Sequence, residues 1–165
     1  LSLSNTVGGA IFHDGNLLPG DAFRCGEAGH MTLIPDGKPC YCGKTGCVDA
    51  YCSARLLSDL SGGRLEDFFL GLQQNNPDYR SVWDTYLKHL AVVINNLHMI
   101  LDYDIVLGGY VGSFLSPWLD TIRRLVAEHN TFEDDGSFVK LCTYQTGAAA
   151  YGAAMDVMEE FLRTV

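Results

Sequence analysis

Apolar and polar positions follow strand-like and helix-like periods in turn along the first half of the chain. Apolar stretches within residues 1–18 flank the turn signal of residues 13–16 and predict a β-hairpin. Residues 20–39 are rich in glycine and show no period, which predicts a loop with one short helical turn. Residues 40–47 form a tight stretch of cysteine and glycine, and residues 48–60 then predict a helix.

Helical spacing dominates the middle of the chain. The glycine pair at 62 and 63 ends the first helix, and residues 65–72 predict a short second one. Pro77 opens a long helix over residues 77–101. Its apolar side chains keep helical spacing: Val82, Trp83, Tyr86, Leu87, Leu90, Val93, Ile94, Leu97 and Leu101.

Two short strands and two further helices complete the pattern. Residues 104–109 predict a buried strand that runs into a glycine turn, and residues 138–143 alternate as a strand. Helices are expected over residues 114–130 and 147–162, the second with a face of small residues. Strands interleaved with long helices predict a layered α/β or α+β fold.

Length and composition indicate which class of protein this chain belongs to. The chain has 165 residues, of which 47% are hydrophobic and 19% charged, as expected of one globular domain. No apolar run approaches the roughly 18 residues of a membrane-spanning helix, and no secretory signal is visible. We therefore expect no membrane association and a cytoplasmic location. Because the chain starts at Leu1 inside an apolar run, we also expect it to be a piece of a longer protein.

The charge argues against nucleic acid as a direct partner. Eleven basic residues stand against twenty acidic ones, which gives a net charge of −9. Binding to a phosphate backbone needs clustered lysine and arginine. The expected partners of this segment are therefore small, neutral or basic.

The cysteines carry the strongest chemical signal. Five of the six, at 25, 40, 42, 47 and 52, lie within 28 residues, and the sixth is Cys142. Three thiolates and one imidazole, from His30, Cys40, Cys42 and Cys47, make a closed four-coordinate set for a structural zinc ion. The alternative is ordinary buried thiols, which is the expectation for Cys25, Cys52 and Cys142.

The residues around these ligands resemble the signature of the ROK family, which groups bacterial sugar kinases with sugar-responsive repressors. The matching segments are Glu27-Ala28-Gly29-His30, residues 40–49 and Ser53, with weaker similarity at residues 105–109 and 147–153. The resemblance implies an actin-like, ribonuclease H-like ATPase fold, of which residues 1–165 would be the C-terminal lobe. The N-terminal lobe would lie outside this chain.

The same resemblance implies a sugar site. In the family, the Glu and His of the E-x-G-H motif and an acid two positions after the last cysteine contact sugar hydroxyls, which assigns Glu27, His30 and Asp49. A carboxylate can accept hydrogen bonds from two neighbouring hydroxyls, and zinc would hold one nitrogen of His30 and leave the other for the sugar. Without the resemblance, Glu27 reads as a solvated loop carboxylate and Asp49 as a first-turn acid that favours the helix dipole. The family usually has Glu where Asp49 stands, so its reach is shorter here.

Two glycine turns favour a regulator over a kinase. Kinases of the family resemble L-G-T-G-x-G-G where this chain has Ser4 and Thr6 in place of two glycines, and G-G-G where it has Tyr110 third. Side chains there are expected to keep backbone amides away from nucleotide phosphates. We therefore expect the effector-binding lobe of a ROK transcriptional regulator, close to the N-acetylglucosamine-repressor-like members. It would bind a sugar without phosphorylating it and meet DNA only through a winged helix-turn-helix outside this chain.

Two other functions remain open from the sequence. The chain can be the C-terminal half of an ATP-dependent ROK sugar kinase of the glucokinase kind, because the hydroxyls of Ser4 and Thr6 can themselves donate to phosphate. It can also be a zinc-stapled dimerisation module without a ligand. A homodimer is expected from the family habit, and the helix over residues 77–101 either contributes to that interface or lies in the core.

Overall fold

The computed structural model describes residues 1–164 and shows a small mixed sheet backed by helices. Strand β1 (Ser2–Leu3) pairs antiparallel with β2 (Val7–Gly8), and β5 (Ile105–Leu107) pairs parallel with β6 (Val139–Leu141). Backbone bonds between Leu3 N and Gly108 O (2.8 Å) and between Gly108 N and Leu1 O (2.9 Å) join the two pairs side by side. The strands therefore follow the order β2-β1-β5-β6, and the predicted α/β class is confirmed.

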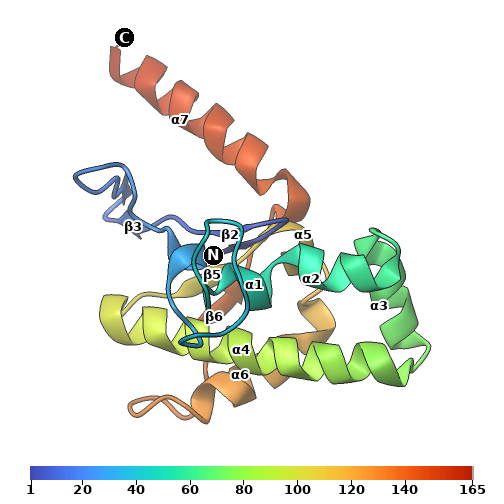
Figure 1. The fold of residues 1–165 in the computed structure, drawn as a ribbon. Helices are drawn as coiled ribbons and strands as arrows, with labels where there is room; N and C mark the ends of the chain where they lie inside the picture. Colours follow the sequence, from blue (N-terminus) through green and yellow to red (C-terminus); the bar gives the residue numbers. More distant parts are fainter. Residues whose placement is uncertain (165) are drawn as a thin grey trace.

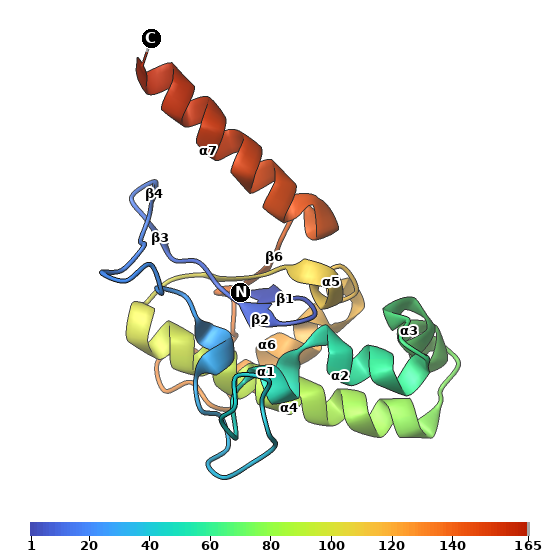
Figure 2. The same ribbon diagram turned by 45° about the horizontal axis from the view of Figure 1, so that its top comes forward.

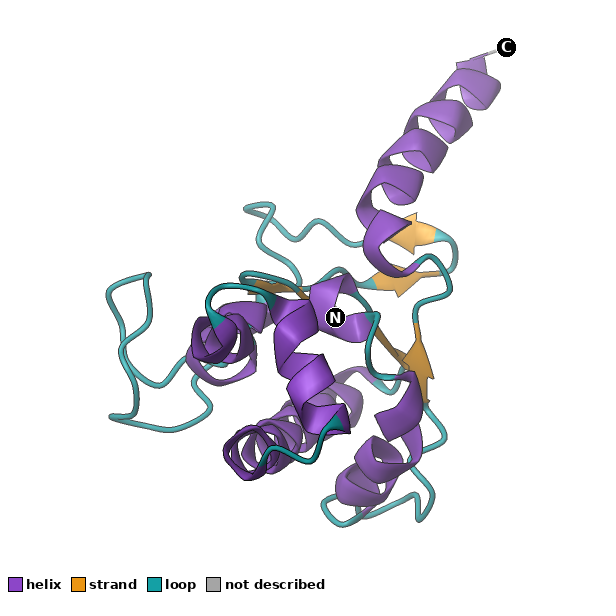
Figure 3. Cartoon of the chain, turned by 90° about the vertical axis from the view of Figure 1, so that its right-hand side faces the viewer, coloured by secondary structure: helices purple, strands orange, loops and turns teal. Residues whose placement is uncertain are grey.

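Two helices back this sheet. Figures 1 and 2 show α4 (Pro77–Leu101) and α6 (Leu119–Ala127) together on one side of the strands, where α4 contacts β5 and α6 contacts β6. The remaining helical elements are η1 (Ala28–His30), α1 (Asp49–Cys52), α2 (Ala54–Ser58), η2 (Asp59–Ser61), α3 (Leu65–Gln73), α5 (Gly109–Gly112), η3 (Ser116–Trp118), η4 (Gln145–Gly147) and α7 (Ala148–Thr164). Figure 3 shows α7 extending away from the body that holds the other helices.

The long helix α4 forms where the sequence places it and runs through the core. The side chain of Asn76 caps it by accepting from the amides of Asp78 (3.0 Å) and Tyr79 (3.3 Å), and Pro77 fills the first helical position. Its face with Trp83, Leu90 and Ile94 is fully buried in this chain's own core. The helical pattern is thus explained by the core alternative, and the homodimer stays a prediction.

Three predicted elements differ in detail. The first 18 residues make two hairpins, because a turn at residues 4–6 separates β1 from β2 before β3 (Phe12–His13) and β4 (Asn16–Leu17) pair. The helix predicted over 48–60 breaks at Ser53, which has an extended backbone (ψ 156°). In this conformation Ala54 N donates a hydrogen bond to Ser4 O (2.7 Å). The helix predicted over 114–130 begins at Leu119, after a 3-10 turn that contains Pro117.

The surplus cysteines and the surface complete the description. Cys52 is fully buried, as predicted, whereas Cys25 and Cys142 are only half-buried. Within residues 1–164, no helix combines the length and the apolar character needed to cross a bilayer.

Candidate functional site

A cluster of metal-ligating side chains lies where the cysteine spacing predicts it. One ligand atom from each of His30, Cys40, Cys42 and Cys47 lies within 4.8 Å of the others. The Sγ atoms of Cys42 and Cys47 are 3.7 Å apart, and all six cysteines are free of disulfides. The donor set is that of a tetrahedral structural zinc site, so the residues present fit a metal ion.

The backbone of residues 37–47 folds back on itself to bring these ligands together. Cys40 N donates to Lys44 O (2.8 Å), and Gly46 N donates to Lys38 O (2.8 Å). Gly46 has a φ of +78°, and a Cβ at this position would overlap the carbonyl oxygen of Ile34. Glycine at 46 is therefore required for the loop to close against residues 31–34.

The thiols differ in their acidity before any metal binds. Burial, together with the hydrogen bonds to Cys42 and Cys40, raises the pKa of Cys47 to about 11. The backbone hydrogen bond from Lys44 lowers the pKa of the exposed Cys42 thiol. Metal ligation requires thiolates, so a bound cation must displace the proton that Cys47 otherwise retains.

The three candidate sugar contacts converge on strand β2. Asp49, only 6% exposed, accepts a hydrogen bond from Val7 N through Oδ1 (2.5 Å). Gly29 packs so closely on the carbonyl of Val7 that a Cβ there would overlap it. This contact fixes η1, which carries His30 at its end and Glu27 as its preceding residue; both side chains are exposed. One strand residue thus positions all three candidates.

Tyr41 joins this group and was missed by the sequence reasoning. Its hydroxyl lies 3.3 Å from Nε2 of His30, and the two rings meet edge to face with centroids 5.5 Å apart. Burial and the negative charge of Asp49 are the first causes that raise the pKa of the Tyr41 phenol, which therefore stays protonated at neutral pH. The only signal in the sequence is the position of Tyr41 between two cysteine ligands.

A polar cleft of about 520 Å³ opens beside the turn between β1 and β2. Asn5 of that turn lines it together with Tyr110 and Ser113, which follow the late glycine turn. The amide of Tyr110 donates to Oγ of Ser4 at 3.4 Å. The two turns that the sequence singled out as phosphate turns therefore lie side by side at one cleft.

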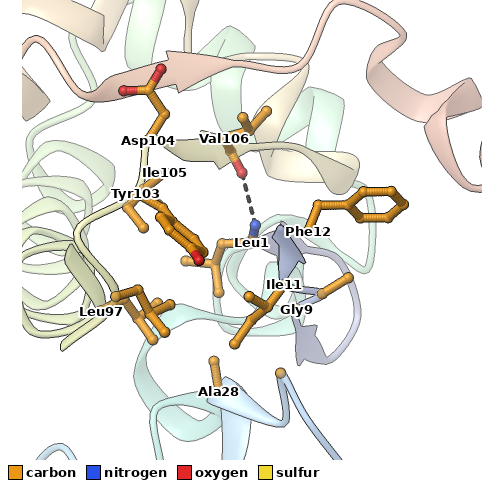
Figure 4. A pocket seen from close by; sticks show the side chains of 13 residues that line it. Leu1, Gly9, Ile11, Phe12, Ala28, Leu97, Tyr103, Asp104, Ile105 and Val106 are labelled. Atoms are coloured by element: carbon orange, nitrogen blue, oxygen red, sulfur yellow. Dashed lines mark hydrogen bonds between the residues drawn. The ribbon is translucent and has the colours of Figure 1, made fainter. Parts of the chain in front are cut away.

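A second cavity, of about 300 Å³, is apolar and lies elsewhere on the sheet. Figure 4 shows its wall of aliphatic side chains from Leu97, Ile105 and Ile11 next to the amino terminus of Leu1, which donates to Val106 O (2.7 Å). Its lining is mostly apolar, and none of the candidate sugar contacts is among the described residues that line it.

Comparison with known proteins finds relatives in one family. A sequence model of the ROK family matches residues 1–160. The N-acetylmannosamine kinase of Salmonella typhi is 29% identical over 163 residues, covering 94% of this chain and 54% of the relative. The glucokinase of Halalkalibacterium halodurans is 29% identical over 189 residues, covering 97% and 56%. The crystal structure of a ROK hexokinase from Thermus thermophilus shares the fold, with a TM-score of 0.75 at 24% identity, covering 96% of this chain and 57% of that one. The chain thus spans about half the length of the curated relatives it matches.

These relatives correct the functional prediction. The expectation of a transcriptional regulator that binds sugar without phosphorylating it is wrong, because the relatives found by sequence are named as an N-acetylmannosamine kinase and a glucokinase. Neither Ser4 nor Thr6 has a positive φ, so the turn forms without glycine at these positions. The Ser4 hydroxyl accepts a hydrogen bond from the amide of Tyr110 and thereby links the two turns.

Proposed function

The chain belongs to the ROK family, and we propose that it is the C-terminal lobe, residues 1–165, of an actin-like, ATP-dependent sugar kinase. One arrangement supports this function above all. Along a single hairpin, Asn5 faces the polar cleft, and Val7, two residues later, holds Gly29 and Asp49. A phosphate donor and a sugar bound at these two places would be held by the same rigid element, as transfer between them requires.

The sugar side uses Glu27, His30 and Asp49. Glu27 is exposed and accepts hydrogen bonds from hydroxyls with either carboxylate oxygen. Asp49 commits Oδ1 to Val7 N, which leaves Oδ2 for a ligand and makes its role partly structural. The relatives are named as kinases of N-acetylmannosamine and glucose, so the proposed substrate is a hexose or an N-acetylhexosamine.

A zinc ion held by His30, Cys40, Cys42 and Cys47 supports this side of the site. All four protein ligands are present and close, so the ion is structural and supplies a staple between η1 and the loop of residues 37–47. The staple fixes the ring plane of His30 and thereby aims its second nitrogen. Reduced thiols of this kind suit the cytoplasmic location predicted from the sequence.

The nucleotide side is the polar cleft at the two turns. Asn5 and Ser113 line this cleft, and the hydroxyls of Ser4 and Thr6 beside it add donors for phosphate oxygens. The general base that the family carries in its N-D-x-N segment would come from residues that precede Leu1. Turnover is therefore expected of the full-length protein only.

The test is ADP release by the full-length protein with ATP, Mg²⁺ and either N-acetylmannosamine or glucose. We expect sugar-dependent turnover in the range of about 1–1,000 per second that is ordinary for enzymes. Replacing Glu27 by Gln should lower kcat/KM by about 10- to 150-fold, the equivalent of a charged hydrogen bond of roughly 1.5–3 kcal/mol.

The matched control is Glu128→Gln, which removes an exposed carboxylate paired with Arg124 on α6 and should leave kcat/KM unchanged. Sugar binding without turnover, or no sugar binding, would refute the kinase assignment. Turnover that is insensitive to Glu27→Gln would refute this placement of the sugar.

A further inference from the structure

Tyr41 occupies the nitrogen of His30 that the sugar needs. Its hydroxyl is 3.3 Å from Nε2, and no other hydrogen bond of that hydroxyl exists among residues 1–164. The side chain is nevertheless 66% exposed, so solvent surrounds most of the ring. Tyr41 therefore rests on His30 without being packed into the protein.

An imidazole nitrogen offers either one N–H or one lone pair, and so it holds one in-line partner at a time. With Nε2 engaged by Tyr41, Nδ1 is the nitrogen left for the metal. A sugar hydroxyl that binds His30 must then take Nε2 from the tyrosine. The two partners compete for one atom.

We propose that Tyr41 is a displaceable gate on the sugar site, whose hydroxyl holds the place of a sugar hydroxyl at His30 Nε2 until the substrate arrives. This inference rests on the proposed function. In the empty site the Tyr41 hydroxyl occupies His30 Nε2, and in the occupied site it points to solvent.

The exposed ring also makes displacement inexpensive. Rotation about the side-chain torsions of Tyr41 breaks one long hydrogen bond and one edge-to-face contact, and buried packing is left intact. In the wild-type protein, the Tyr41–His30 contact should weaken sugar binding by about the free energy of one neutral hydrogen bond. Removing the hydroxyl should therefore tighten sugar binding about two- to tenfold.

The experiment is sugar titration by calorimetry of the full-length protein and its Tyr41→Phe variant, which keeps the ring and removes only the hydroxyl. We expect a sugar Kd two- to tenfold lower in Tyr41→Phe, with an unchanged KM for ATP and an unchanged zinc content per chain. The matched control is Tyr151→Phe on α7, another exposed tyrosine, for which the sugar Kd should not change. An unchanged or a higher Kd in Tyr41→Phe with zinc retained would overturn the gate.

A second measurement covers the case in which the variant loses zinc or fails to fold. In the wild-type protein labelled with ¹³C at the tyrosine rings, saturation with sugar should shift the Tyr41 resonance toward that of a free, solvated ring. An unmoved Tyr41 signal in a protein that binds sugar overturns the gate alone. A wild-type protein that binds no sugar overturns the proposed function and the gate with it.

Discussion

Replacing Asp49 by Ala tests the contact that joins the candidate sugar residues to the sheet. The substitution removes the acceptor of Val7 N–H, a bond of 2.5 Å between residues 42 apart in sequence. Both partners are buried, with Val7 only 4% exposed and Asp49 only 6%. The amide would be left in the interior without the acceptor it has now.

The magnitude follows from that burial. A buried donor left unsatisfied costs about 1–3 kcal/mol, and more when its lost partner was charged. For a chain of this size each kcal/mol corresponds to a melting-temperature shift of about 2–4 °C. We therefore expect Asp49→Ala to lower the free energy of unfolding by about 2 kcal/mol and the melting temperature by about 4–8 °C. Asp49→Asn keeps an acceptor oxygen in place and should lose less.

The assay is urea unfolding of this chain followed by circular dichroism, with the slope m checked for constancy across variants. Asp84→Ala is the control, because it removes only an exposed carboxylate paired with Arg80 at 3.1 Å and should cost about 0.3–0.5 kcal/mol. If Asp49→Ala were no less stable than Asp84→Ala, the argument that Val7 depends on Asp49 would be refuted.

Four further outcomes are expected. Metal analysis should find one zinc per chain, and Cys42→Ser should lower stability by several kcal/mol; a metal content near zero would refute the site. Leu90→Ala, at a fully buried position of α4, should cost about 2–5 kcal/mol in urea unfolding. Burial raises the pKa of the Cys52 thiol. The protonated thiol therefore contributes its full stability below the unfolded pKa of about 8.5, and this contribution falls as the pH rises above that value. The free energy of unfolding should accordingly be lower at pH 10 than at pH 7. Light scattering at micromolar concentration should give the mass of a homodimer.

Local sequence signals determined most of the secondary structure. The Asn76-Pro77 pair and the apolar spacing behind it place α4, since capping and amphipathicity act within a few residues. The metal cluster was equally accessible, because Cys40, Cys42 and Cys47 lie close in sequence and their loop closes on itself. The order of elements and the α/β class follow from such short-range patterns.

Contacts between segments distant in sequence could not be predicted from those patterns. The helix predicted over 48–60 breaks at Ser53 because Ala54 N bonds to Ser4 O, 50 residues earlier, and no local propensity records that partner. The same holds for Ser4 and Thr6: as lost glycines they argued against a kinase, and only the structure shows that the backbone of their turn forms without glycine at either position.

The sequence by itself thus determined the family resemblance, the four candidate metal ligands and the candidate sugar contacts Glu27, His30 and Asp49. Only the tertiary structure decided how those residues are held. It brings Oδ1 of Asp49 to the amide of Val7, packs Gly29 against the carbonyl of Val7 and brings the Tyr41 hydroxyl to Nε2 of His30. The physical reason is that spacing along the chain fixes which side chains share a loop or a helix face, whereas hydrogen bonds and close packing between separate segments are settled only when the whole core forms.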